Sequence, residues 1–557
     1  MTVMQQWEEA GLTLSSALQK YLSACITLTT IVPTSAADTN MQDLAYLIDT
    51  ALSPQGLHVT LAQRLLRSRS ILAQARNRMF ASPLYHLPED ILVNVFTNVI
   101  YSQRRNAAVY MGQKIKSIYK RLHALLGVCS IWRQTTLNHS KLWFLVPVIH
   151  GNPGFSVHRA TSLSLQRAPG ANLHLGAILS QKSHTEAIDI KDVATQIFRF
   201  HAINIVTESD STLHEIFGQL LSASVPKLSE LSLCLDYESE PSTDLATSLE
   251  QRFLFKSAYT YLPQFTKLFE SVTVMRLSGA GTYWDQVTFS NRLVEVRLED
   301  FVLGYEPDLA VLLATLVSAS ELQYLSLISI TTFSNSIPEV LGDLGEDFVA
   351  ILPKLRVLHL EDLYFNTLRD VTKSIAQGSH DLTLFLTPKS LLVAAPIESR
   401  FQNIPLNAVC EVVSRVRVNT LMLSAKHEWL NNRELEMILR STPSLKTLKM
   451  ERWRFHGPVY QALTRPHSFY HAFPRIESLL FTLATIHDPQ KFIDMISSHS
   501  GSIQRLALGV AFYSKATQPY ISYRALAHQL ESQVPSFQLV PGSYTPQEFE
   551  SRIWQLW

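Results

Sequence analysis

The sequence has few cysteines and no long apolar run. Its four cysteines, at positions 25, 129, 234 and 410, are far apart and form no CxxC pair. A disulfide framework needs a short, cysteine-dense secreted chain, so we expect buried free thiols in a reducing compartment. A membrane-spanning helix needs ~18 consecutive apolar residues, and we expect none. The first ten residues lack Lys and Arg, unlike a signal peptide. The predicted localisation is therefore cytoplasmic, nuclear or both.

Excess charge of one sign is also missing. The 557 residues contain 48 basic and 47 acidic side chains, for a formal charge of +1. Nucleic-acid binders usually carry a basic bias, and membrane partners need apolar or basic surfaces, so we predict neither as a partner. Hydrophobic residues make up 46% of the chain, which is enough for a large core.

The motifs of common enzyme classes are absent as well. The sequence contains no Gly-rich phosphate loop, no GxSxG and no HExxH. His467 and His471 in "PHSFYHAF" have the spacing of two helical metal ligands. No third ligand lies near them in the sequence, so we expect ordinary surface histidines. We predict no catalytic residues, no metal and no cofactor.

Residues 1–80 are expected to be helical. Leu14, Leu18 and Leu22 recur at four-residue steps, which gathers them on one helix face. Polar residues with one proline interrupt the pattern at 32–40, and two further helical segments follow. The last of these carries five arginines. They form either a surface for an acidic partner or the solvated side of an amphipathic helix, and the second interpretation is favoured.

Beyond residue 150 a short apolar pattern, Leu-x-x-Leu-x-Leu with aliphatic substitutes, recurs at intervals of roughly 28 residues. A longer gap is expected to hide a degenerate copy near Leu382. The copies begin at Leu228, Val272, Leu293, Leu322, Leu355, Val418, Leu445, Ile476 and Ile503, with a further one at Phe200.

Proline often stands two residues before the pattern, as at Pro353 and Pro443, and the segments before it are helical in pattern. Because proline cannot continue a helix, the repeating unit is predicted to be helix, loop and strand. Such units stack into a parallel sheet lined by helices, with the fourth and sixth residues facing the core and the third, fifth and seventh facing the concave side. The alternative is scattered buried strands of an ordinary α/β protein.

The repeats resemble the leucine-rich-repeat family, without the Asn or Cys that often closes its consensus. The predicted fold class is therefore α/β: an N-terminal helical region, a helical domain and an irregular leucine-rich-repeat solenoid. "TPQE" at 545–548 has the order of a helix start, so residues 545–557 are predicted to form a final helix that covers the open end. The predicted domains are 1–80, 83–147, 155–544 and 545–557.

Three fragments between residues 87 and 143 share one property, a high content of aliphatic and aromatic residues. They are "LPEDILVNVF" from Leu87, "VCSIWR" from Val128 and "LW" at Leu142. A domain of this size buries a small fraction of its surface by itself. In this order the fragments resemble the F-box family, and fungal F-box proteins have a similar N-terminal helical segment. The spacer of 31 residues between Phe96 and Val128 is longer than in the compact version. The alternative is a helical hairpin packed wholly within the protein.

The resemblance implies a function. F-box proteins dock on a Skp-family adaptor, which joins them to a cullin-RING ubiquitin ligase, and hold a target protein on the downstream domain. It also predicts that Leu92→Asp with Trp132→Ala abolishes adaptor binding while the repeats stay folded. Trp132 and Trp143 are expected either to anchor the adaptor or to fasten this domain to the first repeat. The residues implied in adaptor docking are Leu87, Pro88, Ile91, Leu92, Val95, Phe96, Val128, Cys129, Trp132, Leu142 and Trp143.

The concave face of the repeats is the expected target site. Its side chains form columns, one partly basic and one partly acidic, which could read a charged or phosphorylated segment or could neutralise each other; the second is favoured. The residues proposed for substrate binding are Arg276, Arg297, Tyr324, His359, Lys449 and Arg505. The alternative functions are a repeat scaffold that acts outside a ligase and an unrecognised hydrolase.

Overall fold

The computed structural model divides the chain into two compact units, Met1–Pro88 and Glu89–Trp557. The residues that it describes are 2–29, 39–53, 56–79, 87–102, 109–149, 157–170, 172–179, 190–223, 228–236, 253–255, 259–334, 349–376, 378, 380–395, 402–425, 429–466, 473–512 and 523–557.

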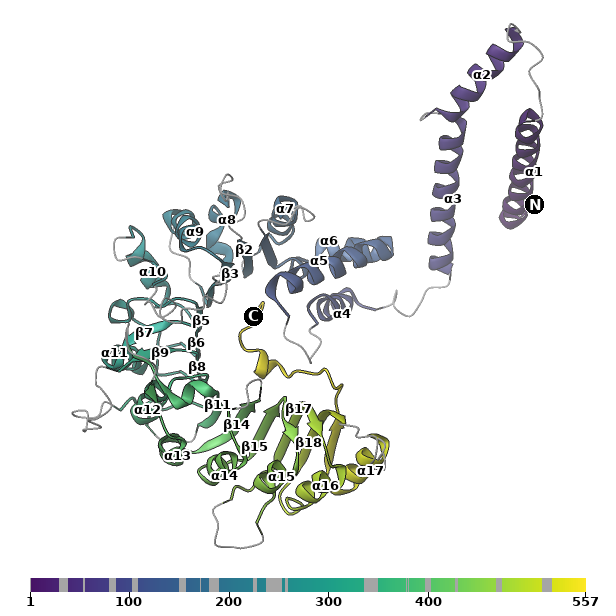
Figure 1. The fold of residues 1–557 in the computed structure, drawn as a ribbon. Helices are drawn as coiled ribbons and strands as arrows, with labels where there is room; N and C mark the ends of the chain where they lie inside the picture. The colour runs from purple at the N-terminus through teal and green to yellow at the C-terminus, as the bar shows by residue number, and fades with distance from the viewer. Residues whose placement is uncertain are drawn as a thin grey trace. The chain divides into compact units, whose positions relative to one another are not determined.

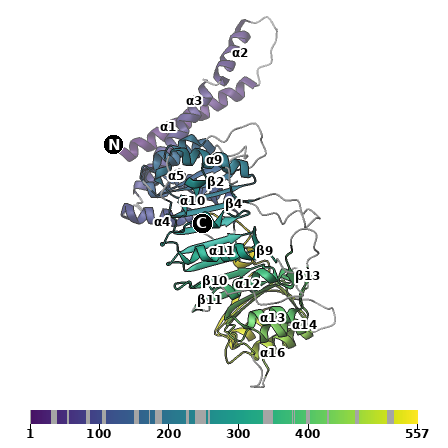
Figure 2. The same ribbon diagram turned by 90° about the vertical axis from the view of Figure 1, so that its left-hand side faces the viewer.

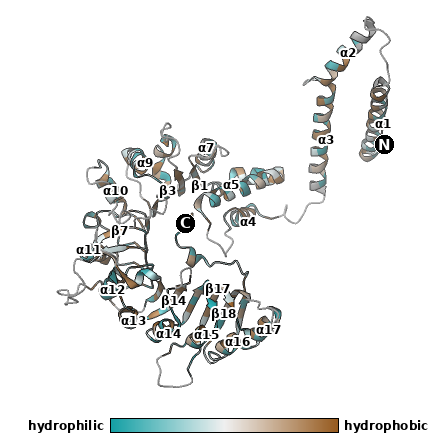
Figure 3. Cartoon of the chain, in the orientation of Figure 1, coloured by the Kyte–Doolittle hydropathy of each residue, from teal (hydrophilic) through white to brown (hydrophobic). Residues whose placement is uncertain are grey.

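The first unit consists of three helices, α1 (Val3–Thr29), α2 (Thr39–Leu52) and α3 (Leu57–Met79). The Tyr21 hydroxyl and His58 Nε2 are 3.1 Å apart and join α1 to α3. Many apolar side chains of this unit are exposed, among them Trp7, Leu12 and Leu66, and hydrophobic residues are spread along its helices in Figure 3. The helical prediction for this region is confirmed, whereas its domain boundary at residue 80 stays a prediction.

The second unit begins with three packed helices, α4 (Glu89–Tyr101), α5 (Met111–Val128) and α6 (Ser130–Asn138), followed by the 3₁₀ turn η2 (Ser140–Leu142). Glu89 and Asp90 occupy the first turn of α4, where acidic side chains interact favourably with the helix dipole. Cys129 is extended and separates α5 from α6, and its Sγ accepts a hydrogen bond from the Trp132 amide at 3.5 Å. Local sequence therefore explains both where α4 begins and where α5 turns into α6.

The main feature of the rest of the unit is one long sheet in which all strand pairs are parallel. In spatial order its strands are β1 (Leu145–Ile149), β2 (Leu173–Leu179), β3 (Phe200–Thr207), β4 (Glu230–Leu235), β5 (Val274–Ser278), β6 (Glu295–Glu299), β8 (Tyr324–Ile328), β10 (Val357–Glu361), β11 (Asp381–Leu386), β14 (Val418–Ser424), β15 (Thr447–Glu451), β17 (Ser478–Ile486), β18 (Arg505–Phe512) and β19 (Ser536–Leu539), with β16 (Arg454–Phe455) beside β17.

Two small sheets lie outside this ladder. One pairs β7 (Val302–Tyr305) with β9 (Thr331–Phe333), and the other pairs β12 (Leu392–Val393) with β13 (Gln402–Asn403).

Helices connect the strands and line the outer side of the arc that the second unit forms, while the strands line its inner side (Figure 1). Figure 2 shows the strands stacked one on the next behind these helices. The helices are α7 (Val157–Arg167), α8 (Lys191–Ala194), α9 (Asp210–Ala223), α10 (Leu262–Leu268), α11 (Glu306–Val317), α12 (Phe365–Ser374), α13 (Leu406–Ser414), α14 (Asn432–Arg440), α15 (Gly457–Leu463), α16 (Pro489–Ser497) and α17 (Tyr523–Gln533), with 3₁₀ turns η3 (Ile197–Arg199), η4 (Trp284–Gln286), η5 (Pro388–Leu391) and η6 (Gln547–Glu550).

The leucine-rich-repeat solenoid predicted from the sequence is confirmed. The fourth and sixth pattern residues face the core, as Leu231 and Leu233 do with no exposed surface. The degenerate copy expected near Leu382 is β11, which pairs with β10 and β14. Helix α14 shows the local cause of one connection, because Asn431 and Glu434 form a reciprocal capping box at its start.

A backbone feature repeats where several strands end. Asp300, Ser329, Asp362 and Arg452 each follow the last residue of a strand and each have φ between 50° and 63°. A non-glycine residue with positive φ is uncommon, and here it recurs in register from one repeat to the next. These four strands therefore end with the same backbone turn.

The predicted final helix over 545–557 is wrong. Only η6 is helical, and residues 551–557 have no helix. We call residues 541–557 the return segment, because it turns away from β19 and runs back across the inner side of the arc (Figure 1). Phe549 of this segment packs edge-on against Phe385 on β11, with ring centroids 5.3 Å apart.

Candidate functional site

The residues implied in adaptor docking divide into two groups, and the first is buried. Phe96 and Leu142 are at most 1% exposed, and Leu92 and Trp143 are at most 5% exposed. The Trp143 indole donates a hydrogen bond to the carbonyl of Thr136 at 2.7 Å. Trp143 is therefore fastened to the end of α6 and cannot be a surface anchor in this conformation, while its predicted role in joining this domain to the first repeat stays a prediction.

The second group is exposed and apolar. Ile91, Val95 and Val128 are 42–55% exposed, and the same holds for Val99 and Ile131. We call these five side chains the apolar face. Ile91, Val95 and Val99 follow one another at four-residue steps, so they form one stripe along α4. Val99 and Ile131 were missed because they fall outside the motif letters, although the helical spacing of Val99 could have found it.

The remaining motif residues lie between these extremes. Trp132 is half-buried and packs against Phe96, with ring centroids 4.8 Å apart. Leu87 and Cys129 are also half-buried, and Pro88 is exposed. The indole of Trp132 therefore links α6 to α4 and keeps one part of its surface open.

Specific bonds hold the three helices in place. Arg121 on α5 donates from Nη1 to the carbonyls of Ile100 at 3.1 Å and Ser102 at 2.8 Å, at the end of α4. Glu89 at the start of α4 contacts His139 at 2.8 Å. The apolar face is therefore presented by helices of fixed position.

Helix α5 is fixed to the solenoid in turn. The Tyr119 hydroxyl donates to the carbonyl of Leu145 at 2.9 Å and lies 2.5 Å from Ser164 Oγ. Burial raises the pKa of Tyr119, so the phenol stays neutral. Gly176 on β2 is packed so closely that an added Cβ would lie 3.1 Å from Ile115 on α5. The three helices and the first strands therefore share one core.

The residues proposed for substrate binding lie on the inner face, the side of the main sheet opposite the helices. Arg276 pairs in register with Arg297, Arg297 with Ser326, and Ser326 with His359. This line of paired residues does not reach Lys449, because the register shifts at β11 between Leu382 and Thr383. Lys449 pairs with Met422, and Met422 pairs with Phe385. Lys449 therefore belongs to the line of Glu361, which pairs with Phe385 and follows His359 two residues later. Tyr324 and Arg505 are exposed.

The charged columns neutralise each other, as the favoured interpretation predicts. Arg276, 7% exposed, contacts Glu295 at 2.8 Å and Glu230 at 3.6 Å. Arg297 is bonded to Glu299, and His359 lies 2.9 Å from Glu361. A phosphopeptide would have to replace these carboxylates, so the arginines do not form a free anion site.

Burial shifts the pKa of one of these carboxyls into the neutral range. The pKa of Glu299 is raised to about 7, first by burial, then by the nearby Glu361 and Asp300, while the Arg297 guanidinium acts in the opposite direction. Asp362 behaves differently. Burial by itself raises its pKa, but the charge of Lys389 outweighs that effect and holds the pKa below its ordinary value. The inner face therefore contains both a neutralisable and a fixed carboxylate.

The return segment occupies the inner face between these columns. The guanidinium carbons of Arg276 and Arg297 lie 4.8 and 5.1 Å from the centre of the Trp557 ring. The buried indole of Trp554 donates to Asn204 Oδ1 at 2.7 Å, and Asn204 Nδ2 donates to the carbonyl of Gln555 at 2.9 Å. Arg276 and Arg297 are therefore covered by an aromatic residue of the same chain.

Polar contacts extend this coverage toward the later repeats. Lys449 Nζ donates to Glu548 at 2.8 Å, the Ser551 hydroxyl donates to Glu361 at 2.5 Å, and Arg552 donates to Asp362 at 2.8 Å. Burial by itself raises the pKa of Glu548, but the charge of Lys449 outweighs it and lowers the pKa. The residues proposed for substrate binding lie on the inner face, and sequence reasoning missed the segment that covers several of them, whereas their role in binding stays a prediction.

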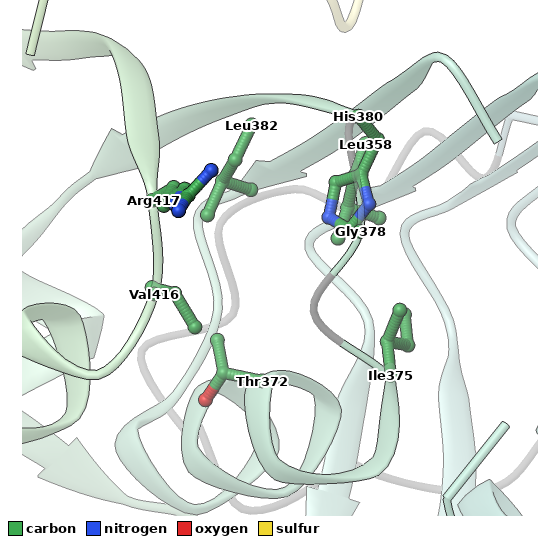
Figure 4. Close-up of a pocket in the computed structure, with 8 residues that line it drawn as sticks. All are labelled: Leu358, Thr372, Ile375, Gly378, His380, Leu382, Val416 and Arg417. Carbon is green, nitrogen blue, oxygen red and sulfur yellow. The ribbon is translucent and has the colours of Figure 1, made fainter. Parts of the chain in front are cut away.

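Two cavities lie away from these surfaces. The smaller, about 20 Å³, is lined by Leu358, Thr372 and Arg417 among others, and Figure 4 shows its lining side chains. It has room for about one water molecule. The larger, about 720 Å³, is lined by Trp429, Trp453, Glu434 and residues near them. Glu434 is engaged in the α14 capping box, and no serine or cysteine lines the larger cavity, so the arrangement of a nucleophilic hydrolase is not met there.

Within the described part of the chain, no group of three or more His, Cys, Asp or Glu residues could hold a metal ion. His467 and His471 lie outside the described residues. No described helix is long and apolar enough to cross a membrane. The four cysteines are free. Cys234 and Cys410 are buried, whereas Cys25 and Cys129 are half-buried, so the prediction of buried thiols is met at two of the four positions.

Comparison with known proteins adds fold relatives only. No protein-family model and no curated protein matches the sequence. Among solved structures, the chain is similar to the leucine-rich repeat-containing protein LegL7 from Legionella pneumophila (12% identity, 64% of this chain and 97% of that chain, TM-score 0.28). It is similar to a chain of the Rad7–Elc1 complex in yeast (12%, 89% and 100%, 0.33) and to TLR13 in complex with ssRNA13 (13%, 71% and 57%, 0.25). None of these assigns a function, because one fold hosts many functions.

Proposed function

We propose that this protein is a non-catalytic substrate receptor of a cullin-RING ubiquitin ligase. A Skp-family adaptor binds the apolar face, which lies on α4, the end of α5 and the start of α6, and a target protein binds the inner face of the solenoid. The observation that carries the proposal is the apolar face itself: five aliphatic side chains, 42–55% exposed, on helices that are otherwise rigidly held. The sequence resemblance between residues 87 and 143 names the partner.

The energetic argument concerns exposed aliphatic surface. Burying an aliphatic side chain fully yields about 1.5–3 kcal/mol, and roughly half of that is still available at each position of the apolar face. Isolated exposed aliphatic residues are normal, but a stripe at helical spacing marks a binding site for another protein. A flat aliphatic stripe with few charges fits an adaptor groove that is itself apolar.

In this role the protein performs no chemistry. It raises the effective concentration of target lysines near a ubiquitin-loaded conjugating enzyme. The rigid core shared by α5, β1 and β2 supports the role, because it keeps the distance between adaptor and target fixed.

Adaptor docking is tested with Val95→Asp. Val95 is exposed, so the substitution leaves the core intact and places a charge in the centre of the apolar stripe. We expect binding to a purified Skp-family adaptor, measured by calorimetry, to weaken more than about tenfold. Asn94→Asp is the matched control, since it adds the same charge at an exposed neighbouring position of α4 and should bind normally.

Equal binding by Val95→Asp and by the unsubstituted chain, with unchanged melting temperatures, would refute docking through this face. The second candidate function is a repeat scaffold that acts outside a ligase. It is favoured if the chain purifies with the adaptor in equal amounts but without a cullin.

A further inference from the structure

We propose that the return segment is an exchangeable occupant of the inner face. In its place the face binds an extended segment of another protein that carries a tryptophan-like aromatic residue and, toward its amino end, an acidic residue. The aromatic residue replaces Trp557 between Arg276 and Arg297, and the acidic residue replaces Glu548 on Lys449. The exchange itself does not depend on the proposed function. The identity of the incoming segment as part of a ubiquitination target does rest on it.

The return segment is held on the inner face without joining the sheet. It contributes no strand to the sheet and has no regular structure beyond η6. Its side chains contact Lys449 through Glu548, Asp362 through Arg552 and two guanidinium groups through Trp557. Its backbone carbonyls at Ser551, Trp554 and Gln555 also accept hydrogen bonds from the body of the protein. Any extended segment offers such carbonyls, so the side chains decide which segment binds, and one with the same side chains in the same order can replace it.

The return segment is an imperfect occupant of the inner face. Trp557 Nε1 is buried and has no hydrogen-bond partner among the described residues, and a buried donor without a partner is destabilising. The Arg552 side chain is 70% exposed where it contacts Asp362, and exposed ion pairs contribute little. A competing segment can pair this indole N–H with an acceptor, or can use an aromatic residue that has no such donor. Either segment binds the inner face with a more favourable free energy than the resident segment.

The return segment is tethered to the face that it covers. It therefore competes for this face at an effective concentration on the order of millimolar. The inner face is therefore open in only a fraction of the molecules. The apparent dissociation constant of any competitor is its intrinsic dissociation constant divided by that fraction. Only segments that match both the aromatic and the acidic position overcome this, so the return segment adds specificity as well as blocking the face.

The test uses the full chain and a labelled peptide of residues 545–557. An open variant, Trp554→Ala with Trp557→Ala, removes the aromatic contacts of the resident segment. We expect this variant to bind the peptide at least about tenfold more tightly than the unsubstituted chain, as measured by fluorescence anisotropy. Ile553→Ala is the control within the same segment and should bind the peptide as weakly as the unsubstituted chain.

Two further measurements identify the chemistry that is recognised. A peptide with Trp557→Ala should bind the open variant at least about tenfold more weakly. Adding Lys449→Glu to the open variant should weaken the peptide, and a peptide with Glu548→Lys should restore binding. A peptide that keeps only Glu548, Trp554 and Trp557 among glycine and serine residues should still compete.

The proposal is overturned if the open variant, with its melting transition intact, binds the peptide no better than the unsubstituted chain. It is also overturned if binding does not depend on Trp557 of the peptide. Val95→Asp in the open variant should leave peptide binding unchanged. Adaptor binding and peptide binding are therefore scored separately, so failure of one proposal cannot be mistaken for failure of the other.

Discussion

The two tryptophans of the motif between residues 87 and 143 show that residue type does not fix residue role. Trp143 is buried and bonded to Thr136, whereas Trp132 is half-buried against Phe96. Leu92, another motif residue, is 5% exposed, so Leu92→Asp would bury a charge and unfold the helices. The predicted double variant would therefore lose adaptor binding for the wrong reason, and Val95 is the position that isolates docking.

At the residue scale, Glu299 predicts a pH dependence of stability. Its pKa in the folded chain is about 7, against an ordinary value of 4.5, so the folded state takes up a proton at higher pH than the unfolded state. The resulting stabilisation is fully present below pH 4.5 and is lost as pH rises through 7. We expect Glu299→Gln, which stays neutral, to gain stability relative to the unsubstituted chain between pH 5 and pH 8, by up to about 3 kcal/mol.

Urea unfolding of both chains at four pH values in this range measures the effect. The difference between the chains cancels the contributions of titrating groups far from position 299. A difference that stays constant with pH would show that Glu299 is ionised throughout, held by Arg297.

At the element scale, the end of α4 depends on one side chain of α5. Arg121 supplies donors to carbonyls that have no partner within α4, at Ile100 and Ser102. We expect Arg121→Met to lower the free energy of unfolding by about 1.5–3 kcal/mol, the range for hydrogen bonds from a charged group. Lys120→Met, at an exposed neighbouring position, is the control in urea unfolding, and similar losses for both would assign the effect to charge alone.

Elements were predictable from sequence to the extent that their signal is local. The Leu-x-x-Leu-x-Leu copies mark β4, β5 and β6 because each apolar position faces the core directly. Strand β1 was missed because Pro147 lies in its centre, and proline argues against a strand. The inner-face columns could be placed but not aligned, because the register shift at Leu382 depends on how two neighbouring strands pack and not on either sequence.

The proposed docking surface shows the same limit. The motif could not separate Val95, which is exposed, from Phe96, which is in the core, because both are apolar and adjacent. Burial decides between them, and burial depends on α5 and on the first strands, which lie far along the chain.

At the scale of the whole molecule, the return segment joins the last repeat to the first. Trp554 is 6% exposed and bonded to Asn204 on β3. We expect Trp554→Ala to destabilise the chain by about 3–5 kcal/mol and to speed hydrogen exchange at β2 and β3. Trp284→Ala, at an equally buried position in the middle of the solenoid, should leave exchange at β2 and β3 unchanged. Equal exchange in both variants would show that the first repeats are stable without the return segment.

The separation of 350 residues between Trp554 and Asn204 also sets an order in time. A ribosome adds ~5–20 residues per second, so roughly 20 to 70 seconds pass between the synthesis of β3 and that of its indole partner. During this interval the early repeats are complete while Arg276 and Arg297 are still uncovered. A nascent chain therefore meets its surroundings with the inner face open until residues 541–557 have been synthesised.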